Sequence, residues 1–408
     1  MRLNPFRAVR PRPDLAAQVA AVPYDVVNRA EAAELARGNP DSFLHVGRSD
    51  IDLPEDVDPY DARIYRRARE ALDDLVARGT LLRDPERRLF LYRQVMDGRA
   101  QTGVVGCVHV EDYERDLIRK HEKTRQDKED DRTRHVLTLN ANAEPVFLTY
   151  RGQADIDRLV KKATSTAALY DFTAPDGVRH TVWPVPDSES LVRAFAPVSH
   201  AYVADGHHRS ASAWRAGREL KAKNPSHRGD EEYNWFLAVL FPSDQLRILP
   251  YNRVVRDLAG QTPAQVLERL RRLGKLSETR DPVPERSGVF CVFLDGRWHR
   301  LELDPAGIHR AEPIASLDVS LLQDRVLSPI LGIGDPRTDK RIDFVGGIRG
   351  TAELERRVRS GEMAIAFSLH PTTLDQLMAV SDAGHVMPPK STWFEPKLRS
   401  GLFVHELS

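Results

Sequence analysis

Five consecutive residues, Asp205–Arg209, have the composition of a phosphate-binding turn. The residues before them, His200–Ala204, are typical of a buried strand, and Ser210–Lys221 are typical of a helix. A turn between a strand and a helix presents free backbone N–H groups and the positive end of the helix dipole at one point, which binds phosphate. Gly206 permits the tight turn and a close backbone approach. The sequence therefore predicts a phosphate site here.

Each side chain of this turn has an expected role. Gly206, His207 and His208 direct amides and side chains at one anion, and Arg209 binds two of its oxygens. Asp205 is a candidate catalytic group and metal ligand. In a purely structural alternative, Asp205 caps the helix, one histidine is a core group and Arg209 lies at the surface. Adjacent histidines beside a carboxylate also suggest a divalent metal, although neighbouring residues rarely face one ion.

A second cluster of reactive side chains lies in the charged stretch from Glu111 to Arg134. His121 and Glu122 form a candidate acid/base pair. Lys123 and Arg132 are candidate phosphate ligands. The alternative is a solvated helix face, because runs of mixed charge are usually exposed.

A third cluster is the C-terminal motif Met387–Lys397. The two prolines before Lys390 hold the backbone extended, which makes this lysine a candidate phosphate ligand. The next residues offer hydroxyls and an aromatic ring as substrate contacts, in Ser391, Thr392 and Trp393. A structural clamp for the tail is the alternative.

A rigid turn near the N-terminus, Pro23–Asp25, forms the fourth candidate. It would direct Tyr24 and Asp25 into a cleft, where both are candidate substrate-binding residues. A turn with no role beyond structure is equally compatible with these three residues.

The elements that must position these residues are both helices and strands. Apolar spacing predicts a helix over Pro59–Arg78, and Leu89–Val95 and Thr102–Val110 are strand-like runs joined by a hairpin turn. The fold class is therefore α/β (α+β), with mixed sheets and flanking helices. We expect a main lobe over residues 1–260, a smaller α/β lobe over 261–362, and a C-terminal segment, 363–408, that packs back on the main lobe.

Composition excludes several classes of function. The 408 residues carry 60 basic and 60 acidic side chains, so no net field favours nucleic acid or a membrane surface. The N-terminus lacks an apolar leader and no stretch approaches the roughly 20 apolar residues of a membrane span, which predicts a cytoplasmic protein. Cys107 and Cys291 lie in strand-like runs and are expected to be core thiols. The Walker sequence and a convincing dinucleotide-binding glycine motif are absent.

Taken together, the motifs resemble the DUF1015 domain family over nearly the whole chain. The segments that carry the resemblance are Pro23–Val27, His121–Thr124 with Asp131–Arg132, Ala204–Arg209 and Met387–Lys397. The Asp205–Arg209 turn also resembles the phosphate turn of the ParB/sulfiredoxin superfamily, which includes free-serine kinases. That likeness implies a ParB/sulfiredoxin-like core around the strand, turn and helix, and a turn that holds the phosphates of a nucleotide or of pyrophosphate.

The resemblance implies a phosphotransferase of serine metabolism, a free-serine kinase that uses pyrophosphate, ATP or ADP. From the chemistry, we expect Mg²⁺ to bridge the donor phosphates with help from Asp205, and Glu122 or His121 to accept the proton of the hydroxyl. The alternatives are a phosphatase on phosphoserine-like substrates and a non-catalytic regulatory protein that binds nucleotide or phosphate. Expected partners are a small-molecule substrate and the phosphate donor, with a homodimer allowed for and neither nucleic acid nor membrane.

Overall fold

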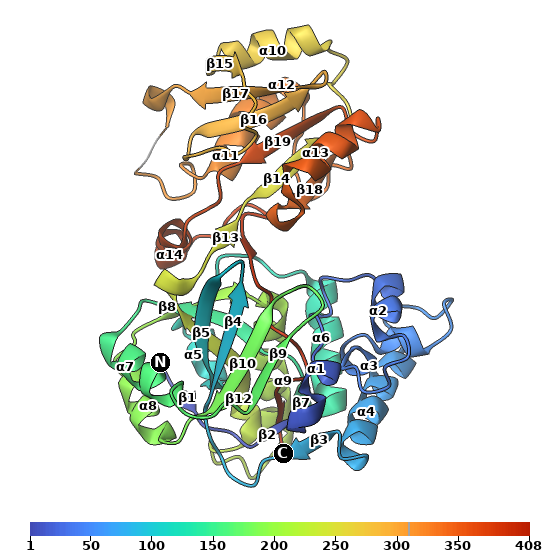
Figure 1. The fold of residues 1–408 in the computed structure, drawn as a ribbon, viewed down its shortest axis with the longest axis vertical. Helices are drawn as coiled ribbons and strands as arrows, with labels where there is room; N and C mark the ends of the chain where they lie inside the picture. The colour runs from blue at the N-terminus through green and yellow to red at the C-terminus, as the bar shows by residue number, and fades with distance from the viewer. Residues whose placement is uncertain (309–310) are drawn as a thin grey trace. The chain divides into compact units, whose positions relative to one another are not determined.

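The computed structural model describes residues 1–308 and 311–408, and they form two compact units. Unit 1 comprises Met1–Leu246 and Pro396–Ser408, and unit 2 comprises Arg247–Glu395. Unit 1 combines helices with one mixed and one antiparallel sheet, and unit 2 combines helices with antiparallel sheets, which confirms the mixed α/β class (Figure 1).

The large sheet of unit 1 has the strand order β6-β11-β8-β12-β5-β4-β10-β9, and β1 pairs with β5. The pairs β6/β11 and β8/β12 are parallel, and the other pairs of this sheet in the described chain are antiparallel. Its strands are β1 (Leu3–Asn4), β4 (Phe90–Met96), β5 (Arg99–His109), β6 (Ile118–Arg119), β8 (Val146–Tyr150), β9 (Tyr170–Thr173), β10 (Arg179–Pro184), β11 (Ala201–Asp205) and β12 (Trp235–Pro242).

The predicted hairpin is the β4/β5 pair. Its turn residues Asp97 and Gly98 have φ angles of 52° and 75°, which suit a two-residue hairpin turn. The apolar run Trp235–Leu240 lies in β12, which pairs with β5 on one side and with β8 on the other.

Helices of unit 1 pack into two large hydrophobic cores and a smaller cluster that includes Val136 of α6 and Ala216 of α9. One core joins the large sheet to α5, α7, α8 and α9, and the other joins α1–α4 to a small sheet of order β3-β2-β21-β7. The helix predicted over residues 59–78 is α4. The bounds are α1 (Ala16–Val19), α2 (Arg29–Ala36), α3 (Leu44–Gly47), α4 (Ala62–Ala77), α5 (Val110–Glu114), α6 (Gln126–Leu139), α7 (Ala154–Ala163), α8 (Ser188–Phe195), α9 (His207–Lys223), β2 (Ala8–Pro11), β3 (Leu81–Arg83), β7 (Ala141–Asn142) and β21 (Val404–Glu406).

Unit 2 is built on a sheet of order β15-β17-β16-β19-β14-β18, against which α13 packs. A separate pair joins β13 to β20. The bounds are β13 (Ile248–Leu249), β14 (Tyr251–Val255), α10 (Pro263–Arg271), β15 (Gly274–Glu278), β16 (Val289–Leu294), β17 (Arg297–Leu303), α11 (Asp318–Leu322), α12 (Ser328–Leu331), β18 (Ile342–Gly346), α13 (Gly350–Arg359), β19 (Ile365–Leu369), α14 (Leu374–Asp382) and β20 (Trp393–Phe394).

The boundaries of the two units differ from the expected lobe boundaries at residues 260 and 362. Strand β14 pairs with β18 and β19, so the chain enters unit 2 before residue 260. Strand β19 is central in the same sheet, so unit 2 continues past residue 362, and only Pro396–Ser408 of the C-terminal segment belongs to unit 1. Cys107 and Cys291 are buried free thiols, as expected. Among the described helices, none combines the length and apolar character needed to span a membrane.

Candidate functional site

Parallel pairing of β6 with β11 brings two of the four sequence motifs together. Ile118 lies opposite Ala201, and Arg119 opposite Tyr202. Because parallel strands end at the same edge of a sheet, the segments that follow them meet there. The loop after β6 therefore lies beside the turn that opens α9.

Contacts between side chains confirm this meeting. The rings of His121 and His207 are perpendicular, with centroids 4.5 Å apart. The backbone N–H of Arg125 donates a hydrogen bond of 3.2 Å to Nε2 of His208. Lys123, in the same loop, is exposed.

The turn itself consists of one residue, Gly206. Its φ of 93° is in the left-handed region, and α9 begins directly after it, at His207 instead of the predicted Ser210. Within the described chain no side chain caps this helix. The amides of its first turn are therefore available to an anion, at the positive end of the dipole. A methyl group on Gly206 would also lie only 3.1 Å from Nε of Arg209, so the arginine side chain would have to shift by a few tenths of an ångström.

Arg209 is held in a buried ion pair. Its guanidinium donates to the Asp205 carboxylate at 3.1 Å and to the Pro145 carbonyl at 2.6 Å, and its side chain is only 7% exposed. The structure thus directs this arginine at protein groups, whereas the sequence suggested an anion ligand. Asp205 pairs with the arginine and does not cap α9, contrary to the structural alternative.

The Asp205 carboxylate has a second cationic neighbour that the sequence did not single out. Nζ of Lys397 lies 3.6 Å from it. Burial acts to raise the pKa of Asp205, but Lys397 and Arg209 outweigh burial and hold the pKa below its usual range. The carboxylate is therefore ionised, with its charge balanced by two cations.

The N-terminal motif reaches the same place. Ala21 and Ser400 exchange two backbone hydrogen bonds, which align the Pro23–Asp25 turn with the C-terminal segment of unit 1. An Asp25 carboxylate oxygen lies 3.8 Å from the Arg209 guanidinium. Asp25 thus adds a further carboxylate beside the buried arginine.

Helix α6 supplies Arg132, because it packs against α9. The guanidinium lies 4.3 Å from the centre of the Tyr24 ring, and its Nε donates to Asp131 at 2.9 Å. Asp131 in turn accepts a hydrogen bond of 2.8 Å from the Tyr65 hydroxyl. Asp131, Arg132 and His135 are all buried, so this part of the charged stretch is not a solvated helix face.

Glu144 is a buried member of the site that sequence reasoning missed. It accepts hydrogen bonds from the Ser400 hydroxyl at 2.8 Å and from the Tyr24 amide at 3.4 Å. Together with Arg132 and Arg209 it lines a cavity of about 30 Å³. Burial raises the pKa of Glu144 against the opposing effect of Arg209. Its neighbours in the sequence, Asn142 and Pro145, are typical of a loop, so no signal in the sequence indicated its burial.

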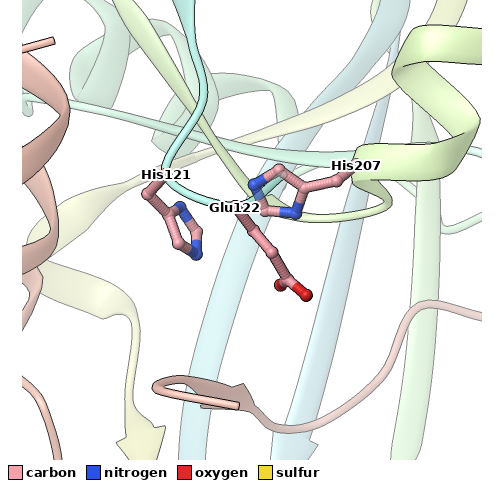
Figure 2. A group of neighbouring side chains, drawn as sticks. All are labelled: His121, Glu122 and His207. Carbon is pink, nitrogen blue, oxygen red and sulfur yellow. The ribbon is translucent and has the colours of Figure 1, made fainter. Parts of the chain in front are cut away.

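Three further donor groups gather where the loop after β6 meets α9. His121, Glu122 and His207 each offer one atom, all within 4.8 Å of one another (Figure 2). Burial lowers the pKa of His121 to about 4, against a hydrogen bond with the Val203 backbone, and it lowers the pKa of His207 as well. Nε2 of His207 is buried, and no group of the described residues hydrogen-bonds it. An unsatisfied buried nitrogen costs about 1–3 kcal/mol, so this position suits a ligand.

The remaining predicted residues belong to unit 2. Nζ of Lys390 lies 5.5 Å from the centre of the Tyr251 ring, and the Trp393 ring lies edge-on to the same tyrosine. The Ser391 hydroxyl donates to the Pro388 carbonyl at 2.6 Å. Thr392 is partly buried beside them. The phosphate role of Lys390 and the substrate roles of its neighbours stay predictions.

Several solved structures are similar to part of this chain. A free serine kinase in complex with AMP is 14% identical, with a TM-score of 0.36, over 74% of this chain and 91% of that one. A conserved hypothetical protein from Pyrococcus furiosus is 14% identical, with a TM-score of 0.34, over 74% and 95%. SbnI from Staphylococcus aureus, truncated at its C-terminus, is 12% identical, with a TM-score of 0.39, over 74% and 87%. Similarity at this level supports no statement about what this chain binds.

The comparison with protein families is more decisive. No curated protein matches the chain. The model of the family described as "Protein of unknown function (DUF1015)" matches residues 3–320, which include both motifs that flank the β6/β11 pair. The protein therefore belongs to the DUF1015 family.

Proposed function

We propose that the protein is a phosphotransferase that acts on a small hydroxylated metabolite. The proposed acceptor is the hydroxyl of free serine, and the donor is pyrophosphate or a nucleotide, ATP or ADP. The observation that carries the proposal is the β6/β11 pairing, which sets the acid/base candidates beside the uncapped start of α9. The choice of serine rests on the resemblance of the Asp205–Arg209 turn to that of free-serine kinases.

The start of α9 supplies the binding site for the transferred phosphate in this proposal. Phosphoryl transfer depends mainly on positioning and on neutralising charge on the transferred oxygens. The amides after Gly206 and the exposed Lys123 would contact those oxygens directly. Arg132 and Arg209 act at longer range, because protein groups already engage part of each guanidinium. Lys390 remains a candidate ligand for the donor.

Glu122 is the proposed proton acceptor. It reaches solvent, whereas His121 is buried and hydrogen-bonded to the Val203 backbone. An incoming hydroxyl can approach the glutamate more readily than the buried ring. His121 then serves to fix the loop that carries Glu122.

Magnesium is expected to accompany the donor phosphates, since it is held largely by phosphate oxygens and water in such sites. Asp205 does not fit as its ligand, because Lys397 and Arg209 already surround that carboxylate with positive charge. The proposed transfer therefore does not use Asp205 as a magnesium ligand.

Phosphorus NMR tests the proposal directly. The full chain is incubated with serine and ATP, ADP or pyrophosphate, and in parallel with phosphoserine. Formation of phosphoserine at the expense of one donor is the expected result. Release of inorganic phosphate from phosphoserine alone would instead show the phosphatase alternative, in which water replaces the acceptor. Thermal stabilisation by a donor without any turnover would show the non-catalytic binding alternative.

Substitution of the proton acceptor sharpens this test. Glu122→Gln should lower the rate constant for transfer by about 100-fold or more, with little effect on donor affinity. Glu114→Gln is the matched control, because Glu114 is exposed at the end of α5. An unchanged rate in the Glu122 variant would place the base elsewhere.

A further inference from the structure

Two histidines and one carboxylate form a set of metal donors, in which the proposed transfer uses Glu122 only as a proton acceptor and His121 only to fix its loop. His121 and Glu122 follow β6, and His207 is the first residue of α9. Figure 2 shows the two rings and the Glu122 side chain grouped at this junction. Since β6 and β11 are paired, the three residues lie together at the ends of these two strands. Two of the three donor side chains are buried.

We propose that His121, Glu122 and His207 bind a divalent transition-metal ion of the zinc or manganese class. Their donor atoms lie within 4.8 Å of one another. Donor atoms around one tetrahedral zinc ion are about 3.3 Å apart, given bonds of about 2.0–2.1 Å. Small side-chain rotations therefore bring the three atoms onto one ion. Three protein ligands leave at least one coordination position open.

The two imidazoles are prepared for this role in different ways. Nε2 of His207 is buried with no hydrogen-bond partner among the described residues, and its residue is only 7% exposed. His121 hydrogen-bonds the Val203 backbone carbonyl through one ring nitrogen. A metal-binding histidine commonly makes such a bond, because it fixes the tautomer and leaves a lone pair on the other nitrogen.

The mixture of donors selects the metal. Magnesium and calcium prefer oxygen ligands, whereas two imidazoles with one carboxylate suit zinc, manganese, iron or cobalt. The positive end of α9 disfavours an isolated cation at this place, but Glu122 supplies one negative charge and the open position accepts an anion or water. A metal ion here would therefore complement the anion-binding start of α9.

This inference stands apart from the phosphotransferase proposal, since it concerns binding of the metal alone. It also gives Glu122 a different role, that of a ligand. The two roles predict different results for Glu122→Gln. Loss of a ligand weakens metal binding in the absence of any substrate, whereas loss of a proton acceptor lowers only the rate of transfer.

The experiment uses the full chain after treatment with a chelator. Zn²⁺ binding is measured by calorimetry, and Co²⁺ binding by its visible absorption bands, without serine or any phosphate compound. One ion per chain is expected. His207→Gln and Glu122→Gln should each weaken binding at least about 10-fold, because loss of even an outer-shell partner costs about 10–100-fold. Excess Mg²⁺ should not displace the bound ion.

His227→Gln provides the matched control. His227 contacts Tyr233 and Glu231 in the loop after α9 and is not one of the three donors. Its variant should bind the metal as tightly as the unaltered chain. Failure of the unaltered chain to bind Zn²⁺ or Co²⁺ would overturn the inference. Equal metal affinity in the Glu122→Gln variant would overturn it as well, because Glu122 reaches solvent and its substitution leaves the core intact.

Discussion

Nζ of Lys397 lies 3.6 Å from the Asp205 carboxylate, next to the guanidinium of Arg209 on the same group. The lysine is the last residue of the C-terminal motif Met387–Lys397 and the second residue after the chain returns to unit 1. Asp205 immediately precedes Gly206, so this ion pair anchors the C-terminal segment to the turn that opens α9. The contact gives a direct means to perturb the proposed phosphate site without altering the turn.

Lys397→Met is expected to lower phosphoryl transfer at least about 10-fold, equivalent to about 1.4 kcal/mol of transition-state stabilisation. Removal of the lysine cation leaves the negative charge of Asp205 less fully neutralised. The electrostatic potential at the start of α9 then becomes less favourable to an anion. Steady-state kinetics measure the effect, and thermal unfolding checks the fold. Lys223→Met is the control, since Lys223 lies at the other end of α9, paired with Glu219. Equal activity in both variants would contradict the prediction.

Arg209→Ala is expected to lower the free energy of unfolding by about 3 kcal/mol or more. The substitution breaks a buried ion pair and leaves the Pro145 carbonyl without its donor, and such losses cost about 3–5 kcal/mol. Urea unfolding measures this. Arg158→Ala, at an exposed pair on α7, should cost less than about 1 kcal/mol. A fully stable Arg209 variant would show that the arginine serves the ligand alone, as the sequence first suggested.

Gly206→Ala should be more damaging than a comparable change at Gly229. Both glycines have positive φ, 93° and 101°, and an alanine pays about 1–2 kcal/mol for that conformation. At Gly206 the methyl group also approaches Nε of Arg209 to 3.1 Å, whereas at Gly229 it meets nothing within 4 Å. The difference in unfolding free energy between the two variants isolates the crowding. Equal losses would mean that Arg209 moves aside freely.

Local pattern predicted the turn but not where its helix begins. Gly206 marks the end of β11 in the sequence, yet His207 and His208 have no strong preference for a helix start, so the prediction placed that start at Ser210. The helix begins earlier because Gly206 reverses the chain in one residue. The hairpin at Asp97 and Gly98 was predictable for the opposite reason, since that dipeptide specifies its turn locally.

Long-range pairing accounts for the site residues that sequence reasoning missed. Lys390 and Lys397 lie in one motif and have the same chemistry, but the chain passes from unit 2 to unit 1 between them. Glu144 reads as an ordinary loop carboxylate until the antiparallel pairing of β8 with β11 brings it near Arg209. His121 and His207 meet only through the β6/β11 pair. Nothing in the spacing of these residues encodes such contacts.

The hydrogen-bonded pair of His45 and Asp52, which lies outside the candidate site, should make the stability of unit 1 depend on pH. Nδ1 of the histidine lies 2.8 Å from an Asp52 carboxylate oxygen, and this hydrogen bond raises the pKa of His45 despite its partial burial. A raised pKa means that the folded state binds the proton more tightly than the unfolded state, whose histidine titrates near about 6.5. The added stability is therefore fully present below about pH 6.5 and is lost as the pH rises through the folded pKa.

His45→Asn should accordingly destabilise unit 1 more at about pH 6 than at about pH 9, by roughly 1 kcal/mol. Urea unfolding at the two pH values measures the difference. A residual loss at the higher pH is expected, because the neutral ring still contacts the Asn39 carbonyl at 3.2 Å. Asp52→Asn should reduce the same pH dependence, since it removes the charge that raises the pKa of His45. The Asp52→Asn variant should also lose the ion pair with Arg67. At high pH its loss of unfolding free energy should therefore exceed that of His45→Asn. If both variants lost equal stability at both pH values, the His45 proton would not be linked to folding.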